Sequence, residues 1–213
     1  MTPVKIVIPD IGPLITLAQA DALELLLCFD DNVRIVLTDY VEFEATRRHG
    51  EFEDAQRICD FLSKHAGRIE IEETSYGKQM KAIDAQRRKY EESAQVRKVY
   101  AEMNLPPPPQ IPDNAGELSI VSYATSLIDE PPGPPCLVIA EDDFFLRSNS
   151  GALPGNAHIV STHAFLQAIE RLGKIGSAES IWSAAFAKGR KANPAIVDLP
   201  ARKIPDITGS TAS

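Results

Sequence analysis

Short apolar runs alternate with segments of helical spacing along most of the chain. The runs are rich in β-branched residues and end at Pro, Asp or a helix-capping residue, which is typical of buried strands. Alternating strands and helices are typical of a mainly parallel sheet covered by helices on both faces. We therefore expect a three-layer α/β fold with a four- or five-stranded sheet. The predicted strands are 4–9, 33–38, 68–73, 136–140 and 157–162.

Apolar positions that recur at helical spacing predict helices between these strands. Within 12–29 the spacing pauses near Ala20 and Asp21, so this segment forms either one helix or two. Thr38 or Asp39 is the expected cap of the helix that follows the second strand. The other predicted helices are 39–48, 51–67, 116–128, 163–173 and 177–192.

The segment 74–112 departs from this alternation. Residues 77–103 are rich in charge and poor in apolar side chains, which predicts a long solvent-exposed helix or a helix pair. The sequence "PPPPQIP" at 106–112 predicts a stiff, extended connector. We therefore expect one main domain over 1–176 with a charged helical insertion at about 74–112, a C-terminal helix at 177–192, and a poorly ordered tail at 193–213.

Composition narrows the function classes. The net charge of −8, from 22 basic and 30 acidic residues, does not attract nucleic acid by the overall field, so any nucleic-acid contact needs local basic patches. The three cysteines are scattered without C-x-x-C spacing, which predicts neither disulfides nor a zinc site. No apolar run is long enough to cross a bilayer, and Pro9, Asp10 and Pro13 exclude a signal peptide. These features predict a cytoplasmic protein that does not bind membranes.

Acidic residues recur where the predicted strands end. Because the carboxyl ends of parallel strands lie at one edge of a sheet, we expect at least four carboxylates to converge there. These acids are Asp10 after the first strand, Glu44 in the helix after the second, Glu117 at the start of the helix before the fourth, and the run of Glu141, Asp142 and Asp143 after the fourth.

Converging carboxylates repel one another and raise one another's pKa unless a cation joins them. Their hard oxygen atoms suit Mg²⁺ or Mn²⁺. A divalent ion held in this way serves in-line displacement at phosphorus, with no Ser, Cys or His nucleophile. The four histidines show no metal-ligand spacing, and the sequence lacks a P-loop, a dinucleotide fingerprint and a G-x-S-x-G elbow.

Five ordered motifs, which together span about residues 4–176, resemble those of PIN-domain ribonucleases, a family that includes the VapC-like toxins of bacterial toxin–antitoxin pairs. Four of the motifs contain the end of a predicted strand, and the third is the start of the helix that carries Glu117. The motifs are "IPDIGPLITLA", "LTDYVEFEATRR", "NAGELSIVSYA", "LVIAEDDFFLR" and "IVSTHAFLQAIERLGKI".

The resemblance implies a metal-dependent endoribonuclease with RNA as substrate, an antitoxin protein as partner and a homodimeric assembly. Glu44 matches the second acid of the family because it follows Val41 by three residues, and Glu42 and Asp39 are its competitors. The last acid is Asp142 or, by one residue of slippage, Asp143. The implied ligands of Mg²⁺ or Mn²⁺ are Asp10, Glu44, Glu117 and Asp142, with Asp143 as the alternative to the last.

Three further residues are candidates for substrate binding. Arg47 and Arg48 close the helix after the second strand and are suited to phosphate contacts, although charged residues on a helix are usually just solvated. Thr162 approaches the site by analogy with the family.

The family motif differs at Ala140, where its members usually carry Thr or Ser. This difference and the acidic net charge favour a second hypothesis, in which the chain is a catalytically inactive interaction module with the same fold. A phosphatase or a DNA nuclease that uses the same acids is a third.

Overall fold

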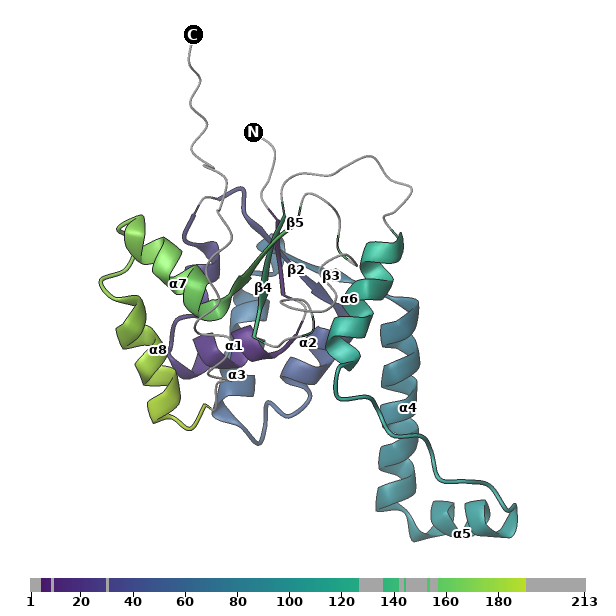
Figure 1. Ribbon diagram of the computed structural model, residues 1–213. Helices are drawn as coiled ribbons and strands as arrows, with labels where there is room; N and C mark the ends of the chain where they lie inside the picture. Colours follow the sequence, from purple (N-terminus) through teal and green to yellow (C-terminus); the bar gives the residue numbers. More distant parts are fainter. Residues whose placement is uncertain are drawn as a thin grey trace.

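A single parallel sheet forms the centre of the computed structural model, which describes residues 5–8, 10–29, 31–126, 136–141, 144, 153 and 157–190. The strand order is β3-β2-β1-β4-β5, and all neighbouring strands are parallel (Figure 1). This arrangement confirms the three-layer α/β fold expected from the sequence. The strands are β1 (Lys5–Val7), β2 (Arg34–Thr38), β3 (Ile69–Glu72), β4 (Cys136–Ala140) and β5 (Ala157–Ser161).

Helices connect the strands as the alternating pattern predicts. The break near Ala20 is present: Asp21 has a φ of 57°, a left-handed conformation that ends α1. The insertion folds as a helix pair, because Ser93 ends α4 and its side chain caps α5 by accepting the N–H of Val96. The helices are α1 (Gly12–Gln19), η1 (Leu23–Leu27), α2 (Asp39–Thr46), α3 (Glu53–Lys64), η2 (Ala66–Arg68), α4 (Ser75–Glu92), α5 (Ala94–Glu102), α6 (Ala115–Ser126), α7 (Thr162–Arg171) and α8 (Ala178–Ala187).

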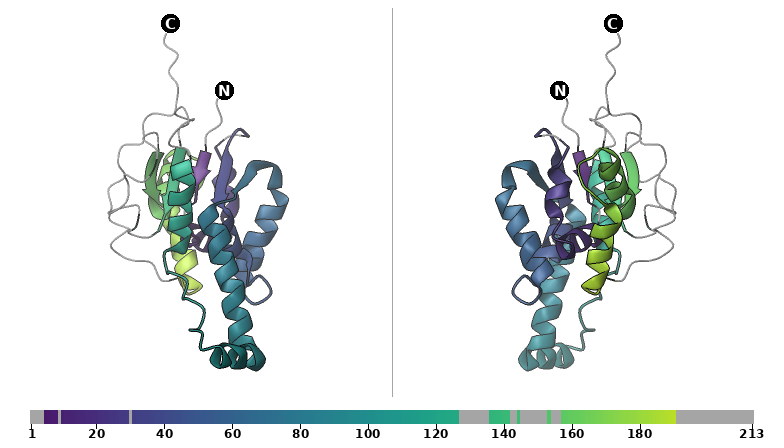
Figure 2. Two further views of the ribbon diagram at one scale, coloured as in Figure 1. Left: turned by 90° about the vertical axis from the view of Figure 1, so that its right-hand side faces the viewer. Right: turned by 90° about the vertical axis from the view of Figure 1, so that its left-hand side faces the viewer.

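The two faces of the sheet pack against different helices. Successive side chains of a strand point to opposite faces. In β2, Ile35 and Leu37 join the larger core against α1, α3, α7 and α8, whereas Val36 joins a smaller core against α6. Figures 1 and 2 show the sheet between these two helical layers.

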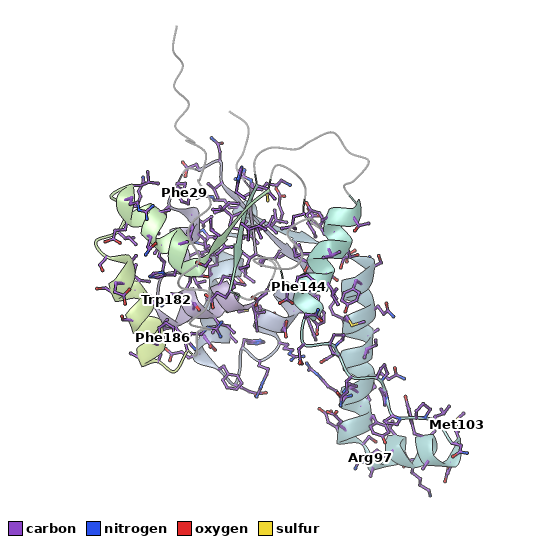
Figure 3. The ribbon with its side chains drawn as sticks, viewed as in Figure 1. Phe29, Arg97, Met103, Phe144, Trp182 and Phe186 are labelled. Atoms are coloured by element: carbon purple, nitrogen blue, oxygen red, sulfur yellow. The ribbon has the colours of Figure 1, made fainter. Side chains whose placement is uncertain are left out.

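The insertion projects from the body as an arm made of the outer part of α4 and of α5 (Figures 1 and 2). The buried residues of α4 are Gly77, Met80 and Asp84, all in its first ten positions, and α5 has none. Near the tip, Met103 is 63% exposed (Figure 3). The base of the insertion therefore belongs to the packed body, while its tip is surrounded by solvent.

α8 is docked on the body through aromatic packing. Trp182 is buried, and its ring centroid lies 5.1 Å from that of His163 and 5.2 Å from that of Phe186 (Figure 3). Within the described ranges, no helix is both long enough and apolar enough to cross a membrane. The tail predicted at 193–213 lies outside the described residues.

Candidate functional site

The carboxyl end of β1 leads directly into α1 through Asp10 and Gly12. Asp10 Oδ1 accepts the backbone N–H of Gly12 at 2.5 Å, which fixes the carboxylate at the first turn of the helix. Pro13 is accommodated there because the first helical N–H groups need no partner within the helix. The sequence "DIGP" therefore places an acid at the edge of the sheet and starts a helix in four residues.

Gly12 leaves space in which side chains from three distant segments meet. A Cβ atom on Gly12 would lie 3.0 Å from Asp10 Oδ2, 3.0 Å from the Cβ of Glu141 and 3.1 Å from Nη2 of Arg190. These groups come from the ends of β1, β4 and α8. A larger residue at position 12 would force them apart, so the glycine serves the close approach of these side chains.

Glu141 lies inside the protein and not at a solvated strand end. Its side chain is 8% exposed, and Oε2 accepts hydrogen bonds from Arg190 Nη2 at 2.7 Å and from Thr16 Oγ1 at 2.9 Å. Arg190 Nε also donates to Thr16 Oγ1 at 3.0 Å. Burying a carboxylate is costly unless it is paired, and Arg190 provides the pairing charge.

The sequence places Glu141 in the acidic run after the fourth strand but does not select it as a ligand, and it gives no reason to select Arg190. A signal for Glu141 was present: it lies two positions after Ile139, which faces α1 in the larger core, so the two side chains share a face. Arg190 had no comparable signal, because its contact with Glu141 spans 49 residues and depends on how α8 docks.

Two buried side-chain oxygen atoms follow the ends of β4 and β5 and have no hydrogen-bond partner among the described residues. Ala140 pairs with Ser161, so Glu141 and Thr162 directly follow the ends of neighbouring strands. Glu141 Oε1 and Thr162 Oγ1 are both buried without a hydrogen-bond partner. Buried polar atoms are normally satisfied by protein, water or an ion. This edge therefore suits a water molecule or a cation, although Thr162 is too deeply buried to contact a substrate directly.

Glu117 reaches the same edge on α6. Glu117 belongs to the first turn of that helix, and the residue is 6% exposed. The hydroxyl groups of Thr38, the last residue of β2, and Ser119 are hydrogen-bonded, which fastens the start of α6 to the end of β2. Since β2 is the neighbour of β1, the start of α6 with Glu117 lies at the same edge of the sheet as Asp10.

Glu44 lies on α2 in a partly buried position that faces α4. Burial raises the pKa of its carboxyl group, while Arg47 lowers it and Asp84 of α4 raises it further. A nearby cation would stabilise the charged form of this carboxyl group, which burial otherwise disfavours.

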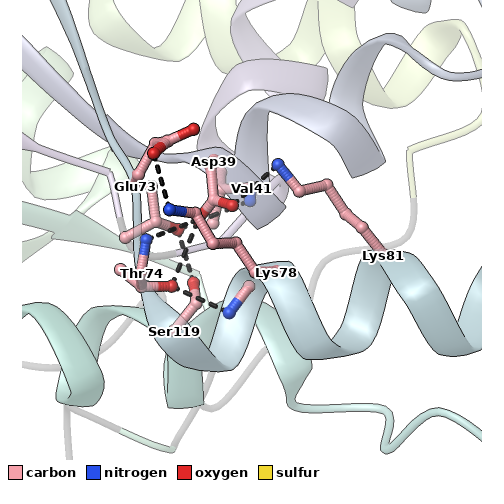
Figure 4. Close-up of polar contacts among 9 residues, drawn as sticks. Asp39, Val41, Glu73, Thr74, Lys78, Lys81 and Ser119 are labelled. Carbon is pink, nitrogen blue, oxygen red and sulfur yellow. Dashed lines mark hydrogen bonds and ion pairs between the residues drawn. The ribbon is translucent and has the colours of Figure 1, made fainter.

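Asp39, the competitor of Glu44, is used to dock the insertion. Its Oδ1 accepts the backbone N–H and the hydroxyl of Thr74, both at 3.1 Å, and Lys81 Nζ lies 2.7 Å from Oδ2 (Figure 4). The hydroxyl of Thr74 in turn accepts the N–H of Gly77 and caps α4. These contacts give Asp39 a structural role at the junction of α2 and α4.

Arg47 and Arg48, predicted to contact phosphates, both form ion pairs within the chain. Arg47 Nη1 lies 2.8 Å from Asp84 Oδ1, and the Asp84 side chain is 11% exposed. Arg48 Nη2 lies 2.6 Å from Glu51 Oε2 in a solvent-exposed pair. Exchanging an exposed pair for a phosphate contact costs little, so Arg48 is the more available of the two.

The structure places two of the predicted ligands, Asp10 and Glu117, at one edge of the sheet and does not complete the set. Glu141, which is not in the predicted ligand set, lies with Asp10 around Gly12. Asp142 and Asp143 lie outside the described residues. In the part of the chain that is described, no group of three or more His, Cys, Asp or Glu side chains is placed to hold a metal ion.

A separate hollow of about 220 Å³ lies at the other end of α1. At 1.5 Å per residue, its Ala18 and Gln19 are roughly 10 Å from Gly12 along the helix. The hollow is therefore distinct from the edge of the sheet where Asp10, Glu117 and Glu141 lie, which we call the carboxylate edge. Its lining residues are Ala18, Gln19, Phe52, Glu53, Asp54, Arg57 and Lys188.

The carboxylate edge offers hard oxygen atoms as possible metal ligands. Carboxylates at the ends of β1 and β4 and at the start of α6 suit Mg²⁺ or Mn²⁺, and the orphaned oxygen of Glu141 fits a cation. Comparisons of the chain with protein-family models, with curated proteins and with solved structures found no match. The residues of the edge therefore carry the functional argument.

Proposed function

We propose that this protein is a metal-dependent endoribonuclease whose site lies at the carboxyl edge of the sheet. The observation that carries the proposal is the meeting of Asp10 and Glu141 around Gly12, with Glu117 at the same edge. In the proposal, Mg²⁺ or Mn²⁺ is held by Asp10, Glu44, Glu117 and Asp142, with Asp143 as the alternative to Asp142. The order of the motifs, which resembles that of PIN-domain ribonucleases, supports RNA as the substrate.

The chain's own residues would prepare the site for this reaction. Asp10 is oriented by the N–H of Gly12, which holds Oδ1 and leaves Oδ2 on the side of Glu141. Arg48, in its exposed pair, would exchange Glu51 for an RNA phosphate. A divalent ion bound at the edge would supply an activated water and stabilise the charge that develops on the phosphate.

The same proposal makes the chain the toxin of a toxin–antitoxin pair that acts in the cytoplasm as a homodimer. The antitoxin is then its protein partner. All three cysteines are free thiols, which is consistent with a reducing compartment. These statements follow from the resemblance and are tested separately from catalysis.

RNA cleavage with and without Mg²⁺ or Mn²⁺ tests the proposal directly. Asp10→Asn and Glu117→Gln should each lower the cleavage rate at least about 10- to 100-fold, since changing even an outer partner of a metal ligand has this effect. The matched control is Glu102→Gln, an exposed carboxylate on α5 that is not among the proposed ligands and does not pair with a proposed phosphate contact. Equal cleavage by wild type and Asp10→Asn would reject the site.

A second candidate function is a catalytically inactive module with the same fold. Two observations favour it: the described side chains alone do not complete a metal-binding group, and Ala140 removes the hydroxyl expected before the last acid. Calorimetric titration with Mn²⁺ separates the two candidates. Only the nuclease requires Mn²⁺ binding that is lost when Asp10 is replaced. A panel of RNA, DNA and phosphate esters identifies a phosphatase or a DNA nuclease if one is present.

A further inference from the structure

Arg190 places a permanent positive charge within the carboxylate edge. Its Nη2 lies 2.7 Å from Glu141 Oε2 and 3.1 Å from the position of a Cβ on Gly12. That same position is 3.0 Å from Asp10 Oδ2. The guanidinium group is therefore paired with the carboxylate that follows β4, and its distance from the Asp10 carboxylate after β1 is at most the sum of the two distances to the Cβ position. The proposed function requires a divalent ion in this region.

The placement of Arg190 is built into the end of α8. Gly189 has a φ of 96°, and the N–H groups of Gly189 and Arg190 donate to the carbonyls of Phe186 and Ala185. A glycine in the left-handed conformation closes a helix in this way and turns the chain back. Because Trp182 and Ala185 are buried in the core, the docked helix directs Arg190 towards α1.

Burial strengthens the electrostatic effect of this arginine. The side chain of Arg190 is 23% exposed and that of Glu141 is 8% exposed, so solvent screens their surroundings poorly. A guanidinium group does not lose its proton at any ordinary pH. A divalent ion arriving beside Asp10 must therefore either displace Arg190 or tolerate its charge.

We propose that Arg190 is a built-in counter-cation that lowers the affinity of the carboxylate edge for divalent ions. The inference rests on the proposed function, because it takes this edge as the cation site. Arg190 neutralises Glu141 while no metal is bound and opposes the metal when it arrives. The opposite possibility is that Arg190 only orients Glu141 for the metal, in which case removing Arg190 weakens binding.

Calorimetric titration of Mn²⁺ into wild type and Arg190→Gln shows whether removing Arg190 strengthens or weakens Mn²⁺ binding. We expect Arg190→Gln to bind Mn²⁺ at least about tenfold more tightly, within the 5- to 150-fold range typical of coupling between two sites. Arg190→Lys keeps the charge and should stay within about threefold of wild type. The matched control is Arg57→Gln: Arg57 also touches α1, donating to the carbonyl of Ala18 at 3.0 Å, and is similarly buried.

A double variant keeps the test decisive if Arg190→Gln fails to fold. Arg190→Gln combined with Glu141→Gln replaces the buried ion pair with two amides and leaves no unpaired charge. If local charge controls affinity, this variant binds Mn²⁺ within about threefold of wild type. If Arg190 orients Glu141 as a ligand, the same variant loses more than tenfold. Thermal melting confirms that each variant is folded.

The outcomes separate this inference from the proposed function. Suppose that Mn²⁺ binding depends on Asp10 but that Arg190→Gln binds Mn²⁺ no more tightly than wild type. This result overturns the inference and leaves the proposed site intact. Binding by Arg190→Gln but not by wild type supports the inference. Mn²⁺ binding that is the same in Asp10→Asn and wild type, or absent from both wild type and Arg190→Gln, overturns both.

Discussion

The backbone of Gly77 lies directly against the carboxylate of Asp39. A Cβ atom at position 77 would overlap Asp39 Oδ1 and would lie 2.8 Å from its Cγ. The Asp39 side chain is fully enclosed and cannot retreat without giving up Thr74 or Lys81. With the bonds from Asp39 to Thr74 and Lys81 (Figure 4), this close packing fastens the first turn of α4 to α2 and so joins the insertion to the body.

Gly77→Ala should therefore destabilise the protein. Alanine is the better helix former by about 1 kcal/mol, but overpacking a well-filled site costs about 1–3 kcal/mol and also threatens the bonds of Asp39. We expect a net loss in the free energy of unfolding, measured by urea denaturation.

Gly67→Ala is the matched control, because nothing lies within 4 Å of a Cβ built at Gly67. Its free energy of unfolding should stay within about 0.5 kcal/mol of wild type, as for most surface substitutions. If Gly77→Ala matched this control, Asp39 would not be packed against α4 as described.

Replacing Glu44 with Gln should stabilise the protein by an amount that depends on pH. Burial raises the pKa of Glu44 above 4.5, so the folded state holds its proton more tightly than the unfolded state does. This preference stabilises the fold below the unfolded pKa and is lost as the pH rises through the folded pKa. Glu44→Gln should therefore unfold less readily than wild type near neutral pH, and the gap should close as the pH falls below about 4.5.

Urea denaturation across this pH range, with chelator present, measures the effect on the metal-free protein. Glu51→Gln, at an exposed position, should follow wild type. If Glu44 is a metal ligand, the same substitution also weakens Mn²⁺ binding, so that stability and function change in opposite directions. A Glu44→Gln protein less stable than wild type at neutral pH would contradict the buried placement of this carboxylate.

The sequence predicted the order and type of the elements because local signals mark them. β2 was expected at 33–38 and is Arg34–Thr38, since a β-branched run ends at a residue that caps the next helix. For the insertion, the sequence does not distinguish one helix from two. The charged composition gives no apolar face to follow there, and Ser93 divides the segment by capping α5.

The site was only partly predictable. Asp10 and Glu117 follow from the rule that parallel strand ends share an edge, which uses topology alone. The choice between Asp39 and Glu44 depends on where α4 docks, because Thr74 and Lys81 engage Asp39. No pattern within a short window contains that information.

Divalent ions should stabilise the folded protein if the carboxylate edge binds them. A ligand at one hundred times its Kd adds about 2.7 kcal/mol to the free energy of unfolding, provided that the unfolded chain does not bind it. Wild type should show this increase with Mn²⁺, and Asp10→Asn should lose it. Urea denaturation with Mn²⁺ or with chelator measures the difference, and an equal increase in both proteins would place the ion elsewhere.

Trp182 is the anchor of α8 and hence of Arg190. Trp182→Ala removes a buried ring packed on His163 and Phe186 and should cost about 3–5 kcal/mol, whereas Leu172→Ala, at an exposed position, should cost less than about 0.5 kcal/mol. Because α8 carries Arg190 to Glu141, a folded Trp182→Ala protein should also bind Mn²⁺ more tightly, as Arg190→Gln does. Urea denaturation followed by circular dichroism checks the first expectation and calorimetry the second. Equal stability of the two alanine variants would show that α8 is not docked through this ring.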